Sequence, residues 1–289
     1  MGDDSNDSAT AGGSIATITD SSGNGNDATQ STASAQPTFT ALDPLNRNYL
    51  QFTAPHHHLQ ATPTISTDIY GVSAFVYLES DVTPSGDKAV IAAVSTSAVL
   101  AYGDISGLVT DELLMVYPAA TYAYADSNGS IPRGWHHLMM AWSPTSQVNS
   151  GSPGYDIYVD GNNVGNVTNT TYGAPTLMTM ASNIPFRVGQ RGDRAYAWSG
   201  LVDEVAVFGA QLTSSDITSI YNNGVPGDIS ALNPAGWWRM GTDDSFVPGD
   251  AVSQVTDHSG NGIHLEQIGV NYMKPIAGVA NSIYVESQP

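Results

Sequence analysis

Two acidic side chains stand next to each other in the strongest strand-like segment of the chain, residues 200–208 (GLVDEVAVF): Asp203 and Glu204. Retaining hydrolysis of a glycosidic bond uses two carboxyl groups about 5 Å apart, which on a strand requires alternate positions. Adjacent strand residues point to opposite faces, so this pair does not suit that chemistry. The sequence contains neither a Glu-x-Asp-x-Glu pattern nor a nucleophile elbow. We therefore predict that the chain is not an enzyme.

A second group of polar residues lies in a Gly-rich segment near the N-terminus, residues 20–26 (DSSGNGN). Its carboxylate, amide and backbone oxygens are the ligands that Ca²⁺ prefers. Asp203 lies in an otherwise apolar strand, where an unpaired charge would cost free energy. Cation binding is one interpretation of these residues. The other is that Asp and Asn form Asx turns and that Asp203 accepts backbone N–H groups.

A third group lies in the segment 190–199 (QRGDRAYAWS), which combines aromatic and charged side chains. Aromatic rings stack on the faces of sugars, and polar groups bind the hydroxyls. One interpretation is a glycan or partner contact; the other is that these aromatic residues cover an edge of the fold. The candidate contact residues are Arg191, Asp193, Arg194, Tyr196 and Trp198.

The composition excludes several classes of function. Among 289 residues, 27 are acidic and 8 are basic, which gives a formal net charge of −19. Such a surface repels the phosphates of nucleic acids and of anionic membranes. The absence of cysteine excludes disulfides and thiolate metal sites. No basic and apolar leader begins the chain, and no apolar run reaches the roughly 20 residues that span a bilayer.

The elements that must position these groups are predominantly strands. Short apolar or alternating runs, rich in β-branched and aromatic residues, are separated by Gly, Asn, Asp and Pro. The run 134–142 is apolar on both faces, as in a central strand. The strands are expected at residues 14–20, 49–53, 69–79, 89–102 (two strands or one bent strand), 112–117, 121–125, 134–142, 185–189, 200–208 and 236–240.

Local signals predict one hairpin and one helix. Asp160-Gly161 divides an alternating run and suits a type I′ turn, so we expect a hairpin within residues 154–168. Thr213 and Asp216 form a capping-box pattern, and Gly224 and Pro226 follow, so a helix of two or three turns is expected between them. Many strands, tight turns and one short helix predict an all-β, antiparallel two-sheet sandwich of the jelly-roll kind.

An internal repeat is the most specific pattern in the sequence. Residues 18–30 (ITDSSGNGNDATQ) recur as residues 255–267 (VTDHSGNGIHLEQ). We predict an arm at 1–13, a sandwich at 14–225, and a linker with a partial repeat and a small β extension at 226–289.

The order of motifs from Gly134 onward resembles the laminin-G-like domains of the concanavalin A-like lectin/glucanase superfamily. The opening segment 20–26 is also similar, so the resemblance covers about residues 14–225. The matching motifs are Trp135-His136, Tyr158-Val159-Asp160-Gly161, Val188-Gly189, residues 200–205, and Leu212-Thr213 with Asp216-Ile217 and Tyr221.

One departure from the family pattern concerns the opening segment, which usually follows a Trp-rich strand. That strand stands here at 236–240, before the second copy of the repeat, and resembles segments of tailed-phage structural proteins. The resemblance also implies a calcium site that joins the opening segment to the Asp-Glu strand. The implied ligands are Asp20, Asn24, Asn26 and Asp203.

These observations lead to one expected function and one alternative. We expect a non-enzymatic virion structural protein (a capsid decoration, fibre or tail-associated part) on the virion exterior, made in the host cytoplasm, with a lectin-like sandwich that binds host-surface glycans. Expected partners are other virion proteins or further copies of the chain, with a trimer suited to a fibre. The alternative is a carbohydrate-binding or adhesion module of a secreted bacterial surface protein, located at the cell surface.

Overall fold

The computed structural model divides the chain into two compact units, Met1–Arg47 with Ala277–Pro289, and Asn48–Ile276. The residues that it describes are 17–18, 28–29, 31–32, 49–52, 58–62, 64–78, 88–94, 97–105, 109–116, 124–126, 131–132, 134–147, 151–164, 166–167, 177–181, 184–191, 197–240, 252–267 and 274–276.

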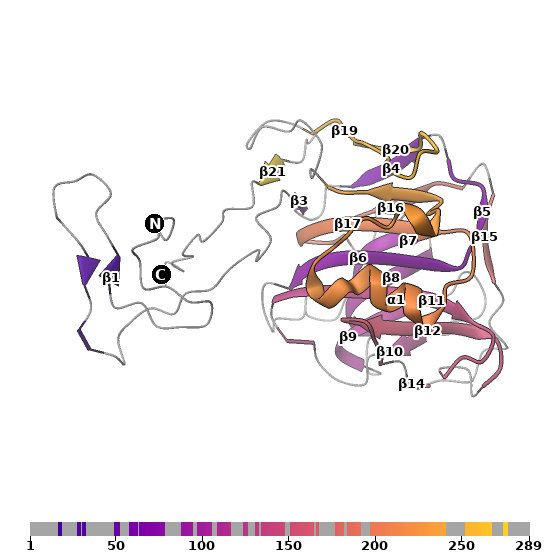
Figure 1. The fold of residues 1–289 in the computed structure, drawn as a ribbon, viewed down its shortest axis with the longest axis horizontal. Coiled ribbons are helices and arrows are strands. Elements are labelled where there is room, and N and C mark those ends of the chain that lie inside the picture. Colours follow the sequence, from indigo (N-terminus) through magenta and orange to yellow (C-terminus); the bar gives the residue numbers. More distant parts are fainter. Residues whose placement is uncertain are drawn as a thin grey trace. The chain divides into compact units, whose positions relative to one another are not determined.

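The larger unit is a sandwich of two antiparallel sheets (Figure 1). The first sheet has the strand order β14-β10-β9-β8-β7-β16-β4-β20-β19, and the second has the order β13-β12-β11-β6-β17-β3-β21, with β18 also paired to β17. A separate pair, β5-β15, lies outside both sheets. The predicted all-β, two-sheet antiparallel sandwich is confirmed.

The bounds of the strands follow the order of each sheet. The first sheet consists of β14 (Asn166–Val167), β10 (Tyr124–Asp126), β9 (Val109–Val116), β8 (Ser97–Ile105), β7 (Lys88–Val94), β16 (Phe186–Val188), β4 (Leu59–Thr62), β20 (His264–Gln267) and β19 (Gln254–Val255). The second consists of β13 (Asn162–Asn163), β12 (Gly154–Val159), β11 (Gly134–Ser143), β6 (Gly71–Leu78), β17 (Gly200–Phe208), β3 (Tyr49–Phe52), β21 (Lys274–Ile276) and β18 (Gly236–Trp238). The separate pair is β5 (Thr67–Ile69) and β15 (Met178–Met180).

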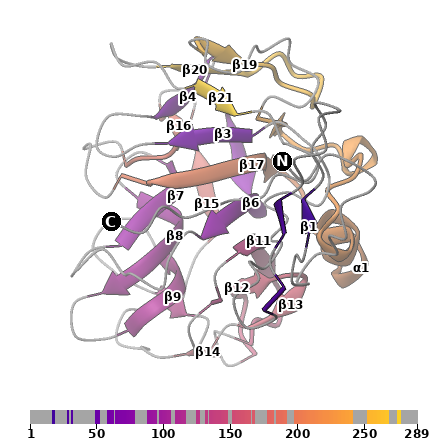
Figure 2. The ribbon, with the colours of Figure 1, turned by 90° about the vertical axis from the view of Figure 1, so that its left-hand side faces the viewer.

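Alternation along the strands places one apolar row between the two sheets and a second row on the outer face of the second sheet. On β11, Leu138 and Met140 belong to the inner core, whereas Met139 and Ala141 belong to the outer cluster. The outer cluster is closed by the helix α1 (Ser214–Tyr221). Figure 2 shows α1 on the side of the second sheet that faces away from β7, β8 and β9. Strand β11 is therefore covered on both faces, as its sequence predicts.

The predicted hairpin and helix are both confirmed. Asp160 and Gly161 have φ angles of 51° and 74°, and they connect β12 to β13 with Val159 opposite Asn162. This is the two-residue turn that matches the twist of paired strands. Thr213 caps α1 in a reciprocal capping box with Asp216. The helix ends at Asn222, which adopts the left-handed conformation with φ 43°.

The alternation predicted for residues 200–208 fails at one position. The pairing of β17 with β6 shifts between Asp203 and Ala206, and Glu204 has a φ angle of 48°. Asp203 lies opposite Phe75, on the face away from the inner core. Glu204 bonds to the indole of Trp237 in the outer cluster. The bulge therefore places both carboxyl groups on the α1 face, and the expectation of opposite faces is wrong.

The two copies of the repeat form the same hairpin. In the smaller unit, β1 (Thr17–Ile18) pairs with β2 (Ala28–Thr29), with Ile18 opposite Ala28. In the larger unit, β19 pairs with β20, with Val255 opposite Leu265. These are the same positions of the repeat. The second copy is built into the sandwich, because β20 also pairs with β4.

Within the described parts of the chain, no helix has the length and apolar character needed to cross a membrane.

Candidate functional site

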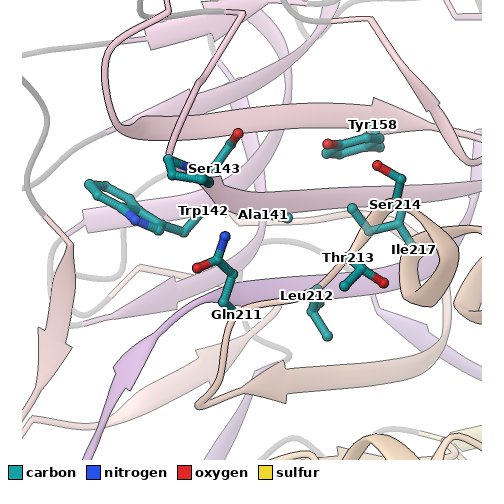
Figure 3. A pocket seen from close by; sticks show the side chains of 10 residues that line it. Ala141, Trp142, Ser143, Tyr158, Gln211, Leu212, Thr213, Ser214 and Ile217 are labelled. Carbon is teal, nitrogen blue, oxygen red and sulfur yellow. The ribbon is translucent and has the colours of Figure 1, made fainter.

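A pocket of about 480 Å³ opens on the α1 face of the second sheet. Figure 3 shows it between the end of β11, the outer face of β12 and the segment that leads into α1. Its volume lies within the range of small-ligand sites. Its lining residues are Ala141, Trp142, Ser143, Pro144, Tyr158, Gln211, Leu212, Thr213, Ser214 and Ile217.

The strand side of the pocket is anchored in the inner core. The Trp142 ring meets the Tyr155 ring edge to face, with centroids 5.0 Å apart. The backbone N–H of Trp142 donates to the backbone carbonyl of Tyr70 at 2.7 Å. Ser146 follows the turn after β11, and its hydroxyl donates to Asp156 on β12 at 2.8 Å. These bonds fix the end of β11 relative to β12, so the wall is rigid before any ligand arrives.

The helix side is held by close packing and by the capping box. Leu212 belongs to the outer cluster and packs over Gly71, where an added Cβ would lie 3.2 Å from Leu212 Cδ1. The side chain of Thr213 donates to Asp216 Oδ2 at 2.7 Å and accepts the Asp216 N–H. The segment 211–214 is thereby held against β6 and β11.

The pocket has an apolar floor and polar groups that are free to bind. The side chains of Gln211 and Ser214 are exposed and form no hydrogen bond with the described residues. Burial raises the pKa of Tyr158 above its ordinary value of 10.0, so its phenol is neutral at physiological pH. Apolar surface, an aromatic wall and uncharged polar groups together suit a small polar ligand with apolar faces.

The sequence identifies the family of this sandwich. A family model described as "Concanavalin A-like lectin/glucanases superfamily" matches residues 48–218, which is more than half of the chain. The chain belongs to this superfamily. The lectin-like resemblance seen in the sequence is thus confirmed, whereas the phage context is not tested by this match. The comparison with curated proteins found no match.

The chain is similar to several solved structures, among them the following three. A "putative carbohydrate binding protein" from Bacteroides ovatus is 15% identical, with a TM-score of 0.54 over 89% of this chain and 68% of that chain. A SAP-like pentraxin from Limulus polyphemus is 16% identical, with a TM-score of 0.45 over 76% and 95% of the two chains. A Trypanosoma rangeli sialidase is 18% identical, with a TM-score of 0.35 over 58% and 23%. At these identities the likeness shows the fold alone.

The predicted calcium ligands of this superfamily member divide into two groups. Asp20, Asn24 and Asn26 lie outside the described residues. Asp203 is 1% exposed, and its Oδ1 accepts the Glu204 N–H at 2.9 Å, as the alternative interpretation expects. Among the described residues, no three His, Asp or Glu side chains converge as metal ligands. Calcium stays a prediction.

The second copy of the motif shows how its carboxylate is used. Asp257 Oδ1 accepts the N–H groups of Trp237 and Ser259, at 3.1 and 2.9 Å. Oδ2 accepts the Ser259 hydroxyl and the Ile263 N–H, at 2.8 and 2.9 Å. A carboxylate has about four lone-pair sites, and four donors fill them. Asp257 does not fit a calcium ligand; it joins the repeat hairpin to β18.

The predicted glycan or partner residues are also split. Asp193, Arg194 and Tyr196 lie outside the described residues. The Arg191 carbonyl accepts a hydrogen bond from Arg187 at 3.4 Å. Trp198 is 3% exposed and packs in the inner core. Its ring is covered, so within the described structure it presents no face to a sugar.

The acidic pair is engaged in the structure of the sandwich. Glu204 is 5% exposed; it accepts from Trp237 Nε1 at 2.8 Å and pairs with Arg239 Nε at 2.9 Å. Asp203 is bonded to the Glu204 N–H. Although the bulge brings the two residues to one face, both carboxyl groups are buried and bonded rather than open to a substrate.

The pocket itself was not anticipated from the sequence. Trp142 and Gln211 are separated by 69 positions (211 − 142), and each looks ordinary in its own segment. The only signal was the combination of a Trp at the end of a central strand with a Gln-Leu-Thr segment that opens a capped helix. Only the pairing of strands brings these segments together.

Proposed function

We propose that the chain is a non-enzymatic carbohydrate-binding protein and that its sugar site is the pocket between β11, β12 and α1. The observation that supports the proposal is the lining: Tyr158 offers aromatic surface, and the side chains of Gln211 and Ser214, which form no hydrogen bond with the described residues, are available to bind hydroxyls. Sugars present apolar C–H faces and rims of hydroxyls, so they require this combination.

A non-catalytic role is supported by the chemistry of the same lining. None of its ten residues is Asp, Glu, His or Cys, so no carboxyl, imidazole or thiol group of the lining faces a bound ligand. The buried pair Asp203-Glu204 is bonded within the fold. Binding without turnover is therefore the function that this pocket suits.

The comparisons support the class of ligand only at the level of the superfamily. The Bacteroides ovatus protein carries the name "putative carbohydrate binding protein", and we extend that class to this chain by proposal. The superfamily also includes glucanases by its description, which is why the lack of a pair of carboxyl groups among the ten lining residues matters.

The test is an NMR titration of the protein with methyl glucoside, methyl galactoside, methyl mannoside and N-acetylglucosamine. We expect at least one sugar to shift the signals of pocket residues. Gln211→Ala should lower the affinity for that sugar by about threefold to tenfold, which corresponds to the loss of one hydrogen bond. Gln254→Ala is the matched control, because Gln254 is an exposed glutamine on β19 and should leave affinity unchanged. No shift with any sugar overturns the proposal.

Where the chain acts and with which proteins it assembles are questions separate from its ligand. We propose that the chain is an exterior virion component that assembles with copies of itself or with other virion proteins. It is supported by the repeat hairpin, which is formed twice with the same pairing, as in chains built from repeated modules. Labelled antibodies and electron microscopy of purified particles test it. A surface-protein reading frame around the gene, with no label on particles, would favour a bacterial adhesion module.

A further inference from the structure

The ten residues that line the pocket contain no charged side chain. We propose that the pocket selects neutral sugars and rejects acidic ones such as uronic and sialic acids; this inference rests on the proposed carbohydrate-binding function. A carboxylate-bearing sugar needs a cation or several free N–H donors to replace its hydration. The ten lining residues include no Arg, Lys or His that could supply such a cation.

Two of the described carboxylates are neighbours of lining residues. Asp156 lies directly opposite Ala141 on the neighbouring strand, where it is 3% exposed. Asp216 lies in the first turn of α1, three residues after Thr213. Both carboxylates repel a negatively charged ligand, as does the net charge of −19 of the whole chain. An anionic sugar would therefore be repelled on approach and in place.

The N-terminus of α1 is a feature that favours an anion, and it already carries the Asp216 carboxylate. Helix N-termini attract negative charge because their first N–H groups lack partners. Here the Asp216 carboxylate accepts both the N–H and the hydroxyl of Thr213, at 2.8 and 2.7 Å. The Thr213 hydroxyl accepts the Asp216 N–H in return. The protein's own carboxylate thus lies at the positive end of α1, where its negative charge offsets part of the attraction for a second anion.

Gln211 is the side chain that we assign to this selectivity. It is exposed, it lines the pocket, and it forms no hydrogen bond with the described residues. A neutral amide can both donate to and accept from a sugar hydroxyl, but it cannot compensate a carboxylate. Replacing the amide by an ammonium changes that one property at the same position.

The experiment measures dissociation constants by NMR for the neutral methyl glycosides and N-acetylglucosamine, and for glucuronic acid and N-acetylneuraminic acid, with the native full chain. We expect the acidic sugars to bind about fivefold to thirtyfold more weakly, the effect of about 1 kcal/mol from each of one or two nearby like charges. Gln211→Lys should strengthen the binding of the acidic sugars by about threefold to fivefold, the contribution of an exposed ion pair. Gln254→Lys, with the same charge change on β19, should leave both classes unchanged.

The outcomes separate this inference from the function on which it rests. Binding of acidic and neutral sugars with equal affinity, reduced by Gln211→Ala, overturns the selectivity and leaves the carbohydrate-binding proposal intact. Equal gains from Gln211→Lys and Gln254→Lys overturn the role of Gln211, because the effect then arises from net charge. Absence of binding by every sugar overturns both proposals.

Discussion

Glu204 and Trp237 are joined by a hydrogen bond of 2.8 Å between the buried carboxylate of β17 and the indole N–H of β18. The same carboxylate pairs with Arg239, whose guanidinium lies 5.3 Å from the centre of the Trp237 ring. Glu204 reaches both partners because its left-handed backbone forms the bulge of β17. The acidic residue that most resembles a catalytic group is therefore a connection between strands.

Removing the Glu204 carboxylate should destabilise the sandwich. Glu204→Ala leaves Arg239 and the Trp237 indole without their shared acceptor, and loss of one member of a buried ion pair costs about 3 kcal/mol or more. Glu204→Gln is the matched control, since it removes the charge but keeps an acceptor for the indole, and its loss should be smaller. Urea denaturation gives the free energies of unfolding. Equal stabilities for the two variants and the native chain would contradict this role.

The hydroxyl of Tyr155 connects β12 to the separate strand pair. It donates to the Ile69 carbonyl and accepts the Met178 N–H at 3.0 Å. Tyr155→Phe leaves both buried groups without a partner, so we expect a loss of about 2 kcal/mol. Tyr70→Phe should cost far less, because the Tyr70 hydroxyl forms no hydrogen bond with the described residues. Thermal unfolding of the two variants checks the difference, and similar melting temperatures would refute the connection.

Local patterns in the sequence were sufficient for the fold class, the hairpin turn and the helix, but not for every strand, since β4, β15 and β21 were not among the expected ones. The Asp160-Gly161 turn and the Thr213 capping box depend on the residues themselves and on neighbours within a few positions, so both were predictable. The bulge at Glu204 was not predictable from the sequence. Its left-handed backbone is stabilised by side-chain bonds to Trp237 and Arg239, which lie 33 and 35 positions later in the chain. Side-chain alternation is reliable only where no such distant contact intervenes.

The candidate site was predictable only in its ingredients. The predicted glycan loop includes Trp198, whose ring proved to be buried in the inner core, since an aromatic residue in a polar loop packs inward when the fold leaves room for it. The pocket combines Trp142 with Gln211 across a boundary between β11 and the segment before α1. No spacing rule relates those two positions, so strand order had to be known first.

The ion pair beneath the hairpin turn should make stability depend on acid pH. Burial raises the pKa of Asp160, but hydrogen bonds from the His136 ring at 2.8 Å and the His137 N–H at 2.9 Å, together with the charges of these histidines, outweigh it and hold the pKa below the ordinary 3.8. A depressed carboxyl pKa stabilises the folded state above the unfolded-state pKa, and this stability is lost as the pH falls through the folded-state pKa.

Asp160→Asn is the informative variant, because Asn-Gly forms the same turn without the charge. Between about pH 5 and about pH 3, the native chain should lose more free energy of unfolding than Asp160→Asn does. Guanidinium denaturation series at both pH values measure the two losses. Parallel losses would show that the Asp160 carboxylate does not contribute.

The repeat hairpin is held to the sandwich by the carboxylate of Asp257, and this bond network requires no metal. Asp257→Ala leaves four donors without acceptors, among them the N–H groups of Trp237 and Ile263. We expect a loss of about 3 kcal/mol and faster amide hydrogen exchange at those two residues. Ser259→Ala removes one of the four donors to Asp257 and the hydroxyl that accepts from Asn261, but it keeps the Asp257 carboxylate. It should therefore release neither the Trp237 nor the Ile263 amide, which makes it the graded control.

Chelation distinguishes this network from a calcium site. Because four donors fill the acceptor positions of Asp257, EDTA should leave the exchange rates of Trp237 and Ile263 unchanged, whereas a carboxylate that served a bound cation would release both amides. Calcium titrated into the chelated protein should likewise protect neither amide. Any calcium heat that persists in Asp257→Ala then belongs elsewhere, and its loss in Asp20→Ala would assign it to the first copy of the motif.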